Sequence, residues 1–442
     1  MKRFLTTFIA LVTLAWAWQL SSMPPVPAGP AAQAWMWREQ ALLLTGLWSF
    51  ALMSLAMVLA TRPVWLERPF GGMDRIYRVH KWAGILAVGF AALHWLVEMS
   101  DDVIKSVWGR EGRLPRDHGS GFLEAMRDVA EDLGEFAIYA LLAMLVLTLW
   151  RRFPFKIWRY LHKVMPVLYL ALAFHAAFLA PRDYWTQPVG AMLAVLIAAG
   201  SMASVLALAG SIGRRRRVAG VVESVREAGP GVTEVSCRLD EGWRGHQPGQ
   251  FAFATFDRLE GAHPFTIASA DRGDRRIVFE IKALGDYTRG LAQRLKTGQA
   301  VQVEGPYGCF SLPSGQTRRD QVWIAGGIGV TPFIAWLEAL QARPDAAPEA
   351  DLYYCVRDRD ADPFVARLES LCAQLPSVRL QVLSSGHNEN LNAAMLGERM
   401  RFRGVADVWF CGPQGLADTL CKGLRDKGLT GIRFHQEAFE MR

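Results

Sequence analysis

No cysteine precedes Cys237 in this chain of 442 residues, and its six cysteines form no C-x-x-C pair and no ferredoxin-like cluster spacing. An iron–sulfur cluster and a disulfide framework are therefore disfavoured, and free thiols fit a reducing, cytoplasmic compartment. No nucleic-acid motif, calcium-binding loop or paired general acid and base stands out. The sequence accordingly offers no support for nucleic-acid binding or for calcium gating.

Apolar residues make up 51% of the chain and are unevenly distributed. Up to residue 213 the sequence is typical of a membrane domain, and after the run Arg214 to Arg217 it is typical of a soluble α/β protein. Because the arginines flank apolar segments, the net charge of +7 is better explained by basic loops at a membrane surface than by nucleic-acid binding.

Six apolar segments approach the ~20 residues that a spanning helix needs: about 4–20, 41–60, 79–98, 134–150, 159–179 and 188–210. The segment 134–150 is short. The first could instead be a cleaved signal peptide, since Lys2 and Arg3 precede an apolar core.

Basic residues gather in the loops on one side of the expected membrane, which the positive-inside rule places in the cytoplasm. They are Arg62, Arg68, Arg75, Arg78, Lys81, Arg151, Arg152, Lys156, Arg159 and Arg214 to Arg217. The opposite side has the Pro-rich segment 21–37, a loop 99–133 with more acids than bases, and PRDYWTQP. We therefore expect a multi-pass protein of the cell inner membrane with both termini cytoplasmic.

Two histidine pairs lie within these apolar segments: His80 with His94, and His162 with His175. Each pair spans roughly 20 Å along a helix, which is room for two stacked haems. By depth, His80 would face His162 near the cytoplasmic side and His94 would face His175 near the outer side. Bis-histidine ligation gives a centre that passes single electrons without binding substrate at the metal.

The alternative is that each histidine is structural and hydrogen-bonded to a neighbouring helix. Helical phase also raises a difficulty, because thirteen residues turn His175 about 140° away from His162. Pro166 lies between them, and a proline kink would change the direction of His175.

The soluble half begins with short alternating stretches from Val218 to about Leu312, which predict an antiparallel barrel or sandwich. From Gln321 onward strands and helices alternate, which predicts a parallel sheet with helices on both faces. The predicted fold class is a six-span α-helical membrane bundle fused to a cytoplasmic antiparallel β-barrel and an α/β nucleotide-binding domain. The expected boundaries are 1–213, 214–315 and 316–442.

Two motifs lie at expected carboxyl ends of parallel strands, where ligands collect. AGGIGVTPF (325–333) would bring backbone amides to a pyrophosphate at a helix N-terminus, or it is only a tight βα turn. WFCGP (409–413) is a nucleotide contact or a strand-end turn. Arg357 would meet a ribose 2′-phosphate, or it is a solvated loop arginine.

Two further motifs fall in the barrel region. HPFTIAS (263–269) sets an aromatic beside a hydroxyl, which suits a flavin ring and its phosphate, and GDYTRGL (285–291) is a turn that can hold a pyrophosphate. By composition alone both are equally compatible with a core strand and a loop.

With these motifs, EGPYG (304–308) and the C-terminal FHQEAFEMR, the chain resembles the ferric reductase and NADPH oxidase superfamily over nearly its whole length. The resemblance implies a six-helix haem-binding domain joined to a ferredoxin-reductase-like FAD and NAD(P)H module. It implies two haem b groups held by His80, His94, His162 and His175.

The resemblance also implies the flavin and nucleotide contacts. The flavin residues are His263, Pro264, Phe265, Thr266, Gly285, Asp286, Tyr287 and Thr288. The nucleotide residues are Gly326, Gly327, Gly329, Thr331, Pro332, Arg357, Cys411, Gly412 and Pro413. Phe439 and Cys411 would act at the flavin and nicotinamide rings, Phe439 covering the flavin until nicotinamide displaces it.

The sequence departs from the family in two places. Met441 stands where related bacterial chains often have a second aromatic, and Glu98 follows His94 where superoxide-making relatives tend to place a basic residue. Glu98 makes dioxygen less favoured as the acceptor, while Arg357 favours NADPH over NADH.

The expected function is transfer of electrons from cytoplasmic NAD(P)H through FAD and two haems to an extracytoplasmic acceptor, either ferric iron or dioxygen. An alternative is an electron-donor subunit for a separate periplasmic partner protein that docks on the loop 99–133. A third is a membrane-anchored reductase with structural histidines.

Overall fold

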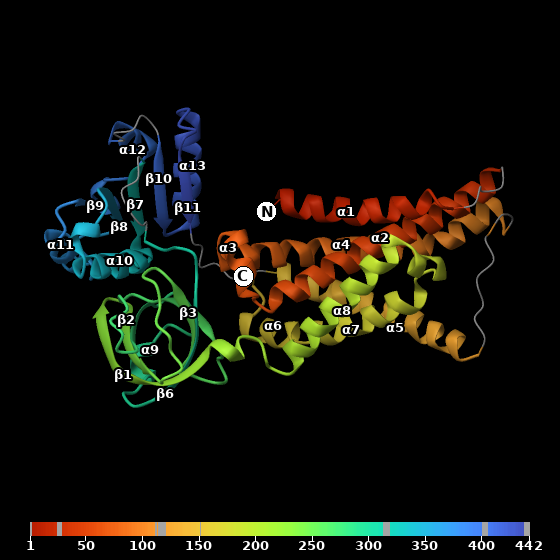
Figure 1. Ribbon diagram of the computed structural model, residues 1–442, viewed down its shortest axis with the longest axis horizontal. Helices are drawn as coiled ribbons and strands as arrows, with labels where there is room; N and C mark the ends of the chain where they lie inside the picture. The colour runs from red at the N-terminus through yellow and green to blue at the C-terminus, as the bar shows by residue number, and fades with distance from the viewer. Residues whose placement is uncertain are drawn as a thin grey trace. The chain divides into compact units, whose positions relative to one another are not determined.

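The computed structural model describes residues 2–23, 29–110, 113, 121–150, 152–312, 319–399 and 405–436. The chain divides into two compact units. The first comprises Met1–Pro63 and Arg75–Ile212, and the second comprises Val64–Asp74 and Gly213–Arg442. Figure 1 shows the helices of the first unit and the two sheets of the second.

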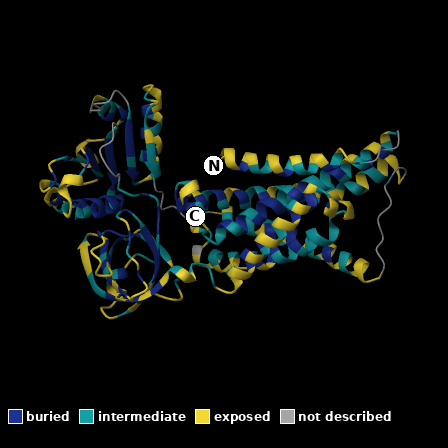
Figure 2. Ribbon diagram, in the orientation of Figure 1, coloured by how far each residue is buried: buried dark blue, intermediate teal, exposed yellow. Residues whose placement is uncertain are grey.

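The first unit is all helical. Its elements are α1 (Lys2–Leu20), α2 (Pro30–Ala60), α4 (Met73–Trp108), α5 (Phe122–Leu149), α6 (Phe155–His162), α7 (Met165–Leu179), η1 (Arg182–Thr186) and α8 (Pro188–Leu208). Among the described residues, six helical stretches are long and apolar enough to cross a membrane, as the sequence predicted. Large apolar side chains such as Leu14, Val146 and Val195 lie exposed on these helices, and Figure 2 shows many exposed residues along them.

Tyr169 of α7 ties three helices together at the centre of this unit. Its buried hydroxyl donates to the carbonyl of Leu196 on α8 at 2.9 Å and lies 2.8 Å from Ser54 Oγ on α2. The ring also occupies the space beside Gly200, where a Cβ would lie 2.1 Å from the tyrosine hydroxyl. Helices α2, α7 and α8 are therefore held at close approach.

Several helices are longer than the apolar segments that predicted them. Helix α4 continues to Trp108 and α5 begins at Phe122, so the expected loop 99–133 is mostly helix and this prediction was wrong. Likewise α2 begins at Pro30, inside the expected Pro-rich segment 21–37. Hydropathy marks only the part of a helix that suits lipid, whereas backbone hydrogen bonding continues through charged turns beyond it.

The predicted span 159–179 is two helices rather than one kinked rod. Helix α6 ends at His162, and α7 begins at Met165 with Pro166 in its first turn, where the missing amide proton would be unpaired in any helix. The helix is interrupted at Lys163 and Val164, so the 140° offset between His162 and His175, which assumes one uninterrupted helix, does not apply.

The second unit begins with a six-stranded antiparallel sheet in the order β4-β3-β6-β1-β2-β5. Its strands are β1 (Arg217–Gly229), β2 (Val232–Leu239), β3 (Phe251–Thr255), β4 (His263–Thr266), β5 (Arg276–Lys282) and β6 (Ala300–Tyr307). A bridge between Ile267 and Phe279 joins the segment after β4 to β5, the opposite edge strand. This arrangement is consistent with the predicted barrel, and α9 (Leu291–Arg294) follows the GDYT turn.

A five-stranded parallel sheet follows, in the order β11-β10-β7-β8-β9. The strands are β7 (Asp320–Gly326), β8 (Ala350–Val356), β9 (Val378–Ser384), β10 (Ala406–Cys411) and β11 (Arg433–Gln436). The helical elements are η3 (Gly327–Val330), α10 (Thr331–Gln341), η4 (Pro344–Ala346), α11 (Val365–Ala373), η5 (Ser385–His387), α12 (Ala393–Arg399) and α13 (Gln414–Asp426). Strand β11 and helix α12 were not predicted.

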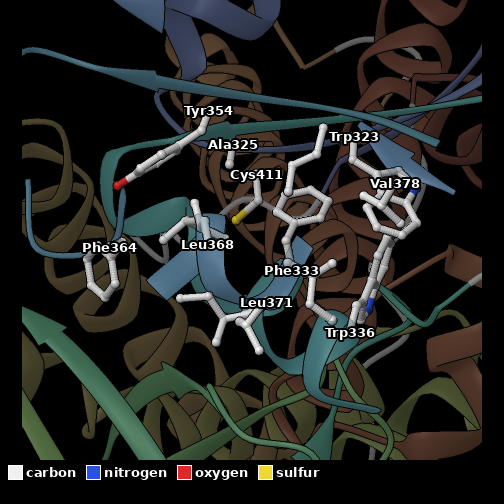
Figure 3. Close-up of a cluster of buried hydrophobic side chains, with 14 of the residues drawn as sticks. Trp323, Ala325, Phe333, Trp336, Tyr354, Phe364, Leu368, Leu371, Val378 and Cys411 are labelled. Carbon is white, nitrogen blue, oxygen red and sulfur yellow. The ribbon is translucent and has the colours of Figure 1, made fainter. Parts of the chain in front are cut away.

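Alternate residues of β7 point to opposite faces of this sheet, because side chains alternate along a strand. Trp323 packs with Phe333 and Trp336 of α10 in one core, whereas Ile324 packs with Leu420 of α13 in another. Figure 3 shows the first of these cores. The prediction of helices on both faces is therefore confirmed.

A short segment between two membrane helices belongs to the second unit. Helix α3 (Val64–Phe70) carries the buried Glu67, whose Oε1 accepts a hydrogen bond from the backbone amide of Gly308 at 2.6 Å. Burial raises the pKa of Glu67, partly offset by that amide and by Arg216. The EGPYG turn is thus bonded to a segment far away in sequence.

Candidate functional site

The four membrane histidines form two facing pairs in the first unit. The ring centres of His80 and His162 are 6.1 Å apart with an interplanar angle of 81°. Those of His94 and His175 are 6.3 Å apart at 82°. A metal held at ~2 Å from one nitrogen of each ring would separate the ring centres by roughly 6 Å. Each pair therefore fits one iron between its own two rings.

Backbone hydrogen bonds orient three of the four imidazoles. The Nδ1 atoms of His80, His94 and His175 lie 2.9, 2.9 and 2.7 Å from the carbonyl oxygens of Ala56, Leu42 and Ala130. A carbonyl can only accept, so each Nδ1 carries the proton and each Nε2 keeps a lone pair for a metal. Within the described chain, these Nε2 atoms make no hydrogen bond of their own.

The fourth histidine is held differently. The ring of His162 stacks on Trp158 at 4.8 Å, and its buried Nδ1 has no hydrogen-bond partner among the described residues. No group of three or more histidine, cysteine or acidic side chains in the described part of the chain is arranged to hold a metal. Two imidazoles at the distances given above fit a metal group whose other ligands do not come from the chain, as in a haem.

Two glycines that the sequence analysis did not single out pack against the second pair. A Cβ on Gly46 of α2 would lie 3.1 Å from the ring of His94, and one on Gly134 of α5 would lie 2.4 Å from the ring of His175. Because these contacts join different helices, no local pattern in the sequence marks them.

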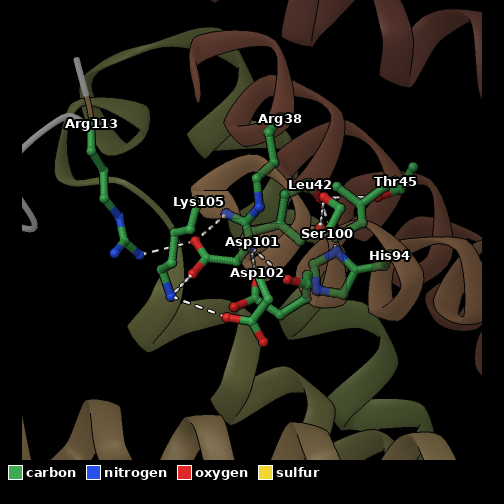
Figure 4. Close-up of polar contacts among 11 residues, drawn as sticks. Arg38, Leu42, Thr45, His94, Ser100, Asp101, Asp102, Lys105 and Arg113 are labelled. Carbon is green, nitrogen blue, oxygen red and sulfur yellow. Dashed lines mark hydrogen bonds and ion pairs between the residues drawn. The ribbon is translucent and has the colours of Figure 1, made fainter. Parts of the chain in front are cut away.

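A network of charges lies one to three helical turns beyond His94 (Figure 4). Arg38 donates to the Glu98 carboxylate at 2.9 Å and to its carbonyl at 2.7 Å, and Asp101 contacts Arg38, Lys105 and Arg113. Glu98 is therefore neutralised by an arginine from α2 that sequence reasoning missed.

The flavin motifs meet at one end of the antiparallel sheet. The four residues of HPFT form β4, and the ring of His263 stacks on Tyr287 at 3.9 Å and 9°. Burial raises the pKa of Tyr287 to about 12, so its hydroxyl stays protonated. Two motifs separated in sequence are thus brought together.

The GDYT turn is ordered by its own threonine. Thr288 Oγ1 accepts from the amides of Leu284 and Gly285 at 3.0 Å and donates to the carbonyl of Gly285. Gly285 and Asp286 are exposed, and Arg294 contacts the carbonyl of Tyr287. The turn is therefore held in shape while its outer face remains open to a ligand.

The nucleotide motifs collect at the carboxyl edge of the parallel sheet. Gly326 ends β7, Gly327 and Gly329 lie in η3, and Thr331 and Pro332 open α10. Arg357 follows β8 with its side chain exposed, and Gly412 and Pro413 follow β10. Lys282 of β5 was not predicted, and its Nζ lies 3.7 Å from the Cβ position of Gly327, which has φ +53°.

Three of these glycines also have a packing role. A Cβ on Gly329 would lie 2.2 Å from the Cys411 carbonyl oxygen, one on Gly326 would lie 2.7 Å from Pro413, and one on Gly412 would lie 3.0 Å from Gly326. The turn after β7 therefore contacts the turn after β10 backbone to backbone. Both readings of these motifs, a tight turn and a ligand cradle, remain compatible with this geometry.

Cys411 and Phe439 are the two side chains predicted to act at the nicotinamide and flavin rings, and the structure describes only the first of them. Cys411 is 0% exposed and lies in the apolar core with Phe333 and Leu368 (Figure 3). Burial of this kind leaves its thiol no exposed atom for contact with a nicotinamide in this structure. Phe439 lies outside the described residues.

One arginine and two carboxylates join the antiparallel sheet to the helices of the parallel one. Arg367 of α11 donates to Glu280 of β5 at 3.0 Å and to Glu338 of α10 at 2.6 Å. Glu280 Oε2 is buried without a hydrogen-bond partner in the described chain. Burial and the nearby Glu234 raise the pKa of Glu280 to about 7, against the opposing effect of Arg367.

This raised pKa predicts a pH-dependent stability. The folded protein holds the Glu280 proton more tightly than the unfolded chain, so stability is full below about pH 4.5 and is lost as pH rises through about 7. The shift corresponds to about 3 kcal/mol at most. In Glu280→Gln the flavin-release temperature should fall less between pH 5 and 8, whereas exposed Glu241→Gln should follow the wild type. Equal slopes in all three proteins would contradict this assignment.

Comparison with known families agrees with the fold and the motifs. Residues 45–173 match the ferric reductase like transmembrane component, residues 224–311 match an FAD-binding domain, and residues 323–422 match an oxidoreductase NAD-binding domain. These domains define a membrane-bound electron-transfer oxidoreductase with FAD- and NAD-binding modules. The set matches a ferric reductase-like protein with a ferredoxin-reductase-type module, which confirms the resemblance seen in the sequence.

Individual relatives match part of the chain. The chain is 30% identical to the vanillate O-demethylase oxidoreductase of Pseudomonas sp. (strain HR199 / DSM 7063) over 152 residues, 34% of this chain and 45% of the relative. It is 24% identical to the toluate 1,2-dioxygenase electron transfer component of Pseudomonas putida over 199 residues, 43% of this chain and 58% of the relative. The chain thus spans about half the length of the curated relatives it matches.

A solved structure of the FAD/NAD binding domain of nitric oxide dioxygenase from Vibrio cholerae O1 biovar El Tor is also similar. The identity is 20%, the TM-score is 0.41, and the match covers 50% of this chain and 98% of that one.

Proposed function

We propose that the chain is a transmembrane NAD(P)H oxidoreductase that uses FAD and two b-type haems to deliver electrons to an acceptor across the membrane. The observation that carries this proposal is the pair of facing imidazole couples, 6.1 and 6.3 Å between ring centres, in the same chain as FAD- and NAD-binding domains. Ferric iron and dioxygen are the candidate acceptors.

Each part of the chain has an assigned task. His80 with His162, and His94 with His175, would each hold one haem iron through Nε2. The β4 strand and the GDYT turn would hold FAD, and the turns after β7 and β10 would hold the nucleotide, with Arg357 favouring NADPH. Bound there, FAD and the haems supply the conversion of a hydride into single electrons and their relay.

The protein residues contribute binding and orientation. Thr288 accepts hydrogen bonds from the amides of Leu284 and Gly285 at the start of the GDYT turn, so the shape of the turn does not depend on a ligand. Gly327 exposes backbone near the α10 N-terminus, where a phosphate is favoured by the amides and the helix dipole. Lys282 adds a positive charge at this point.

The proposal places the protein in the cell inner membrane with both termini and the FAD/NAD(P)H module in the cytoplasm. It retains the division into residues 1–213, 214–315 and 316–442. The basic loops support this orientation, since four candidate spans separate the loop with Arg62 and Arg68 from the run Arg214 to Arg217, and an even number of crossings would return the chain to the same side. On this topology the His94 and His175 pair lies toward the acceptor.

Anaerobic stopped-flow reduction of the full-length protein by NADPH tests the function. Flavin bleaching should precede reduction of two haems, and subsequent mixing with chelated ferric iron or with oxygen should identify the acceptor by the faster haem reoxidation. Repeating the reduction with NADH in place of NADPH tests the nucleotide preference proposed for Arg357. Reduced haem that neither acceptor reoxidises would favour a donor subunit for a periplasmic protein, and flavin reduction without any haem band would overturn the proposal.

A further inference from the structure

The two imidazoles of the His94 and His175 pair are held by the same local arrangement on two different helices. His94 donates its Nδ1 proton to the carbonyl of Leu42 on α2, and the residue four positions later is Gly46. His175 donates to the carbonyl of Ala130 on α5, and the residue four positions later is Gly134. In both cases the ring lies against that glycine.

Helix geometry explains the spacing of four. The carbonyl of residue i already accepts the amide of residue i+4, and the Cβ of residue i+4 tilts back over this same turn. A side chain at i+4 therefore lies beside the carbonyl of residue i. At Leu42 and Ala130 the imidazole lies within 3.1 Å of the position that a Cβ at residue i+4 would occupy.

The two glycines differ in how tightly the ring packs. A Cβ on Gly134 would lie 2.4 Å from both Cε1 and Nδ1 of His175, a distance that real atoms do not tolerate. A Cβ on Gly46 would lie 3.1 Å from the same atoms of His94, which a shift of a few tenths of an ångström would relieve. The His175 ring has little freedom to yield, since Ala130 holds one side and His94 faces the other.

The His80 and His162 pair lacks this double arrangement. His80 bonds to the carbonyl of Ala56, and the residue four positions later is Ala60. His162 makes no such bond in the described chain and stacks on Trp158 instead. A carbonyl that accepts the Nδ1 proton makes Nε2 a stronger electron donor to a metal and so favours ferric over ferrous iron.

We propose that Gly46 and Gly134 are positioning residues for the His94 and His175 pair: each leaves the room in which one imidazole bonds to the carbonyl four residues earlier and directs Nε2 toward its partner. This inference rests on the proposed haem function. It assigns to the two glycines the placement of both imidazole ligands of one of the two irons.

Potentiometric titration and EPR of the full-length protein containing FAD and haem test the proposal. Wild-type protein should show two haem midpoints, and His94→Ala identifies which midpoint and signal belong to the second pair. Gly134→Ala should abolish the highly anisotropic low-spin signal that perpendicular imidazoles give at that site, or raise its midpoint. Gly46→Ala should raise the same midpoint by a smaller shift. The midpoint of the His80 and His162 site should stay unchanged in both variants.

Gly89→Ala is the matched control, because Gly89 also lies in a membrane helix but nothing lies within 4 Å of its Cβ position. At ~100° per residue, Gly89 faces away from His80 on α4. Wild-type potentials and signals in Gly134→Ala and Gly46→Ala would overturn the inference while leaving the proposed function intact. Wild-type protein without haem would instead overturn the proposed function. If Gly134→Ala does not accumulate, the shift in Gly46→Ala decides the question.

Discussion

Under the proposed function, replacing His94 with alanine is expected to remove one of the two proposed haems from each chain and to stop electron delivery to an external acceptor. The ring of His94 faces His175 at 6.3 Å, and no other histidine in the described part of the chain is paired with either. Removing a residue that hydrogen-bonds to a metal ligand typically lowers metal affinity or activity about 10- to 100-fold. Removing the ligand itself should therefore lower the rate of acceptor reduction by about 100-fold or more.

The measurement is the ratio of haem to flavin absorbance, followed by reoxidation of NADPH-reduced protein. Flavin reduction should be unchanged in His94→Ala, because the flavin and nucleotide motifs lie in the other compact unit. His387→Ala is the control, since this histidine is exposed at the edge of the parallel sheet. A His94→Ala protein that retains two haems with wild-type reoxidation would show that the histidine is structural.

The second large effect is expected from Gly329→Ala, which should nearly abolish flavin reduction by NADPH. The added Cβ would lie 2.2 Å from the Cys411 carbonyl oxygen and 2.9 Å from the Gly412 amide nitrogen. Both are backbone atoms, so no side-chain rotation relieves the clash and the two turns must separate. Overpacking of this kind costs about 1–3 kcal/mol, and a displacement near 1 Å at a reacting site lowers rates by about 100-fold.

Gly415→Ala is the matched control. Gly415 lies in α13, nothing lies within 4 Å of its Cβ position, and alanine is the better helix former by about 1 kcal/mol. Its stability should equal or exceed that of the wild type. Reduction by dithionite should proceed normally in Gly329→Ala, which separates a nucleotide defect from loss of flavin. Wild-type reduction by NADPH in this variant would contradict the close packing of the two turns.

Several features followed from local sequence patterns. Apolar segments of spanning length predicted the six membrane helices, and alternation of strand and helix predicted the parallel sheet with helices on both faces. These signals are local, because hydropathy and side-chain period act over one element at a time. The same signals missed the true ends of α4 and α5, since charged turns continue a helix without adding hydropathy.

Other features depend on how elements rotate and pack against one another. His162 and His175 lie on two helices, α6 and α7, and each faces its partner histidine, and Arg38 reached Glu98 from another helix. Burial among residues from several elements set the environment of Glu280.

Spacing along the chain placed the four histidines in two layers. Only interhelical packing brought two of these histidines to the carbonyls of Leu42 and Ala130, because a contact between helices depends on rotation and register that no single segment encodes.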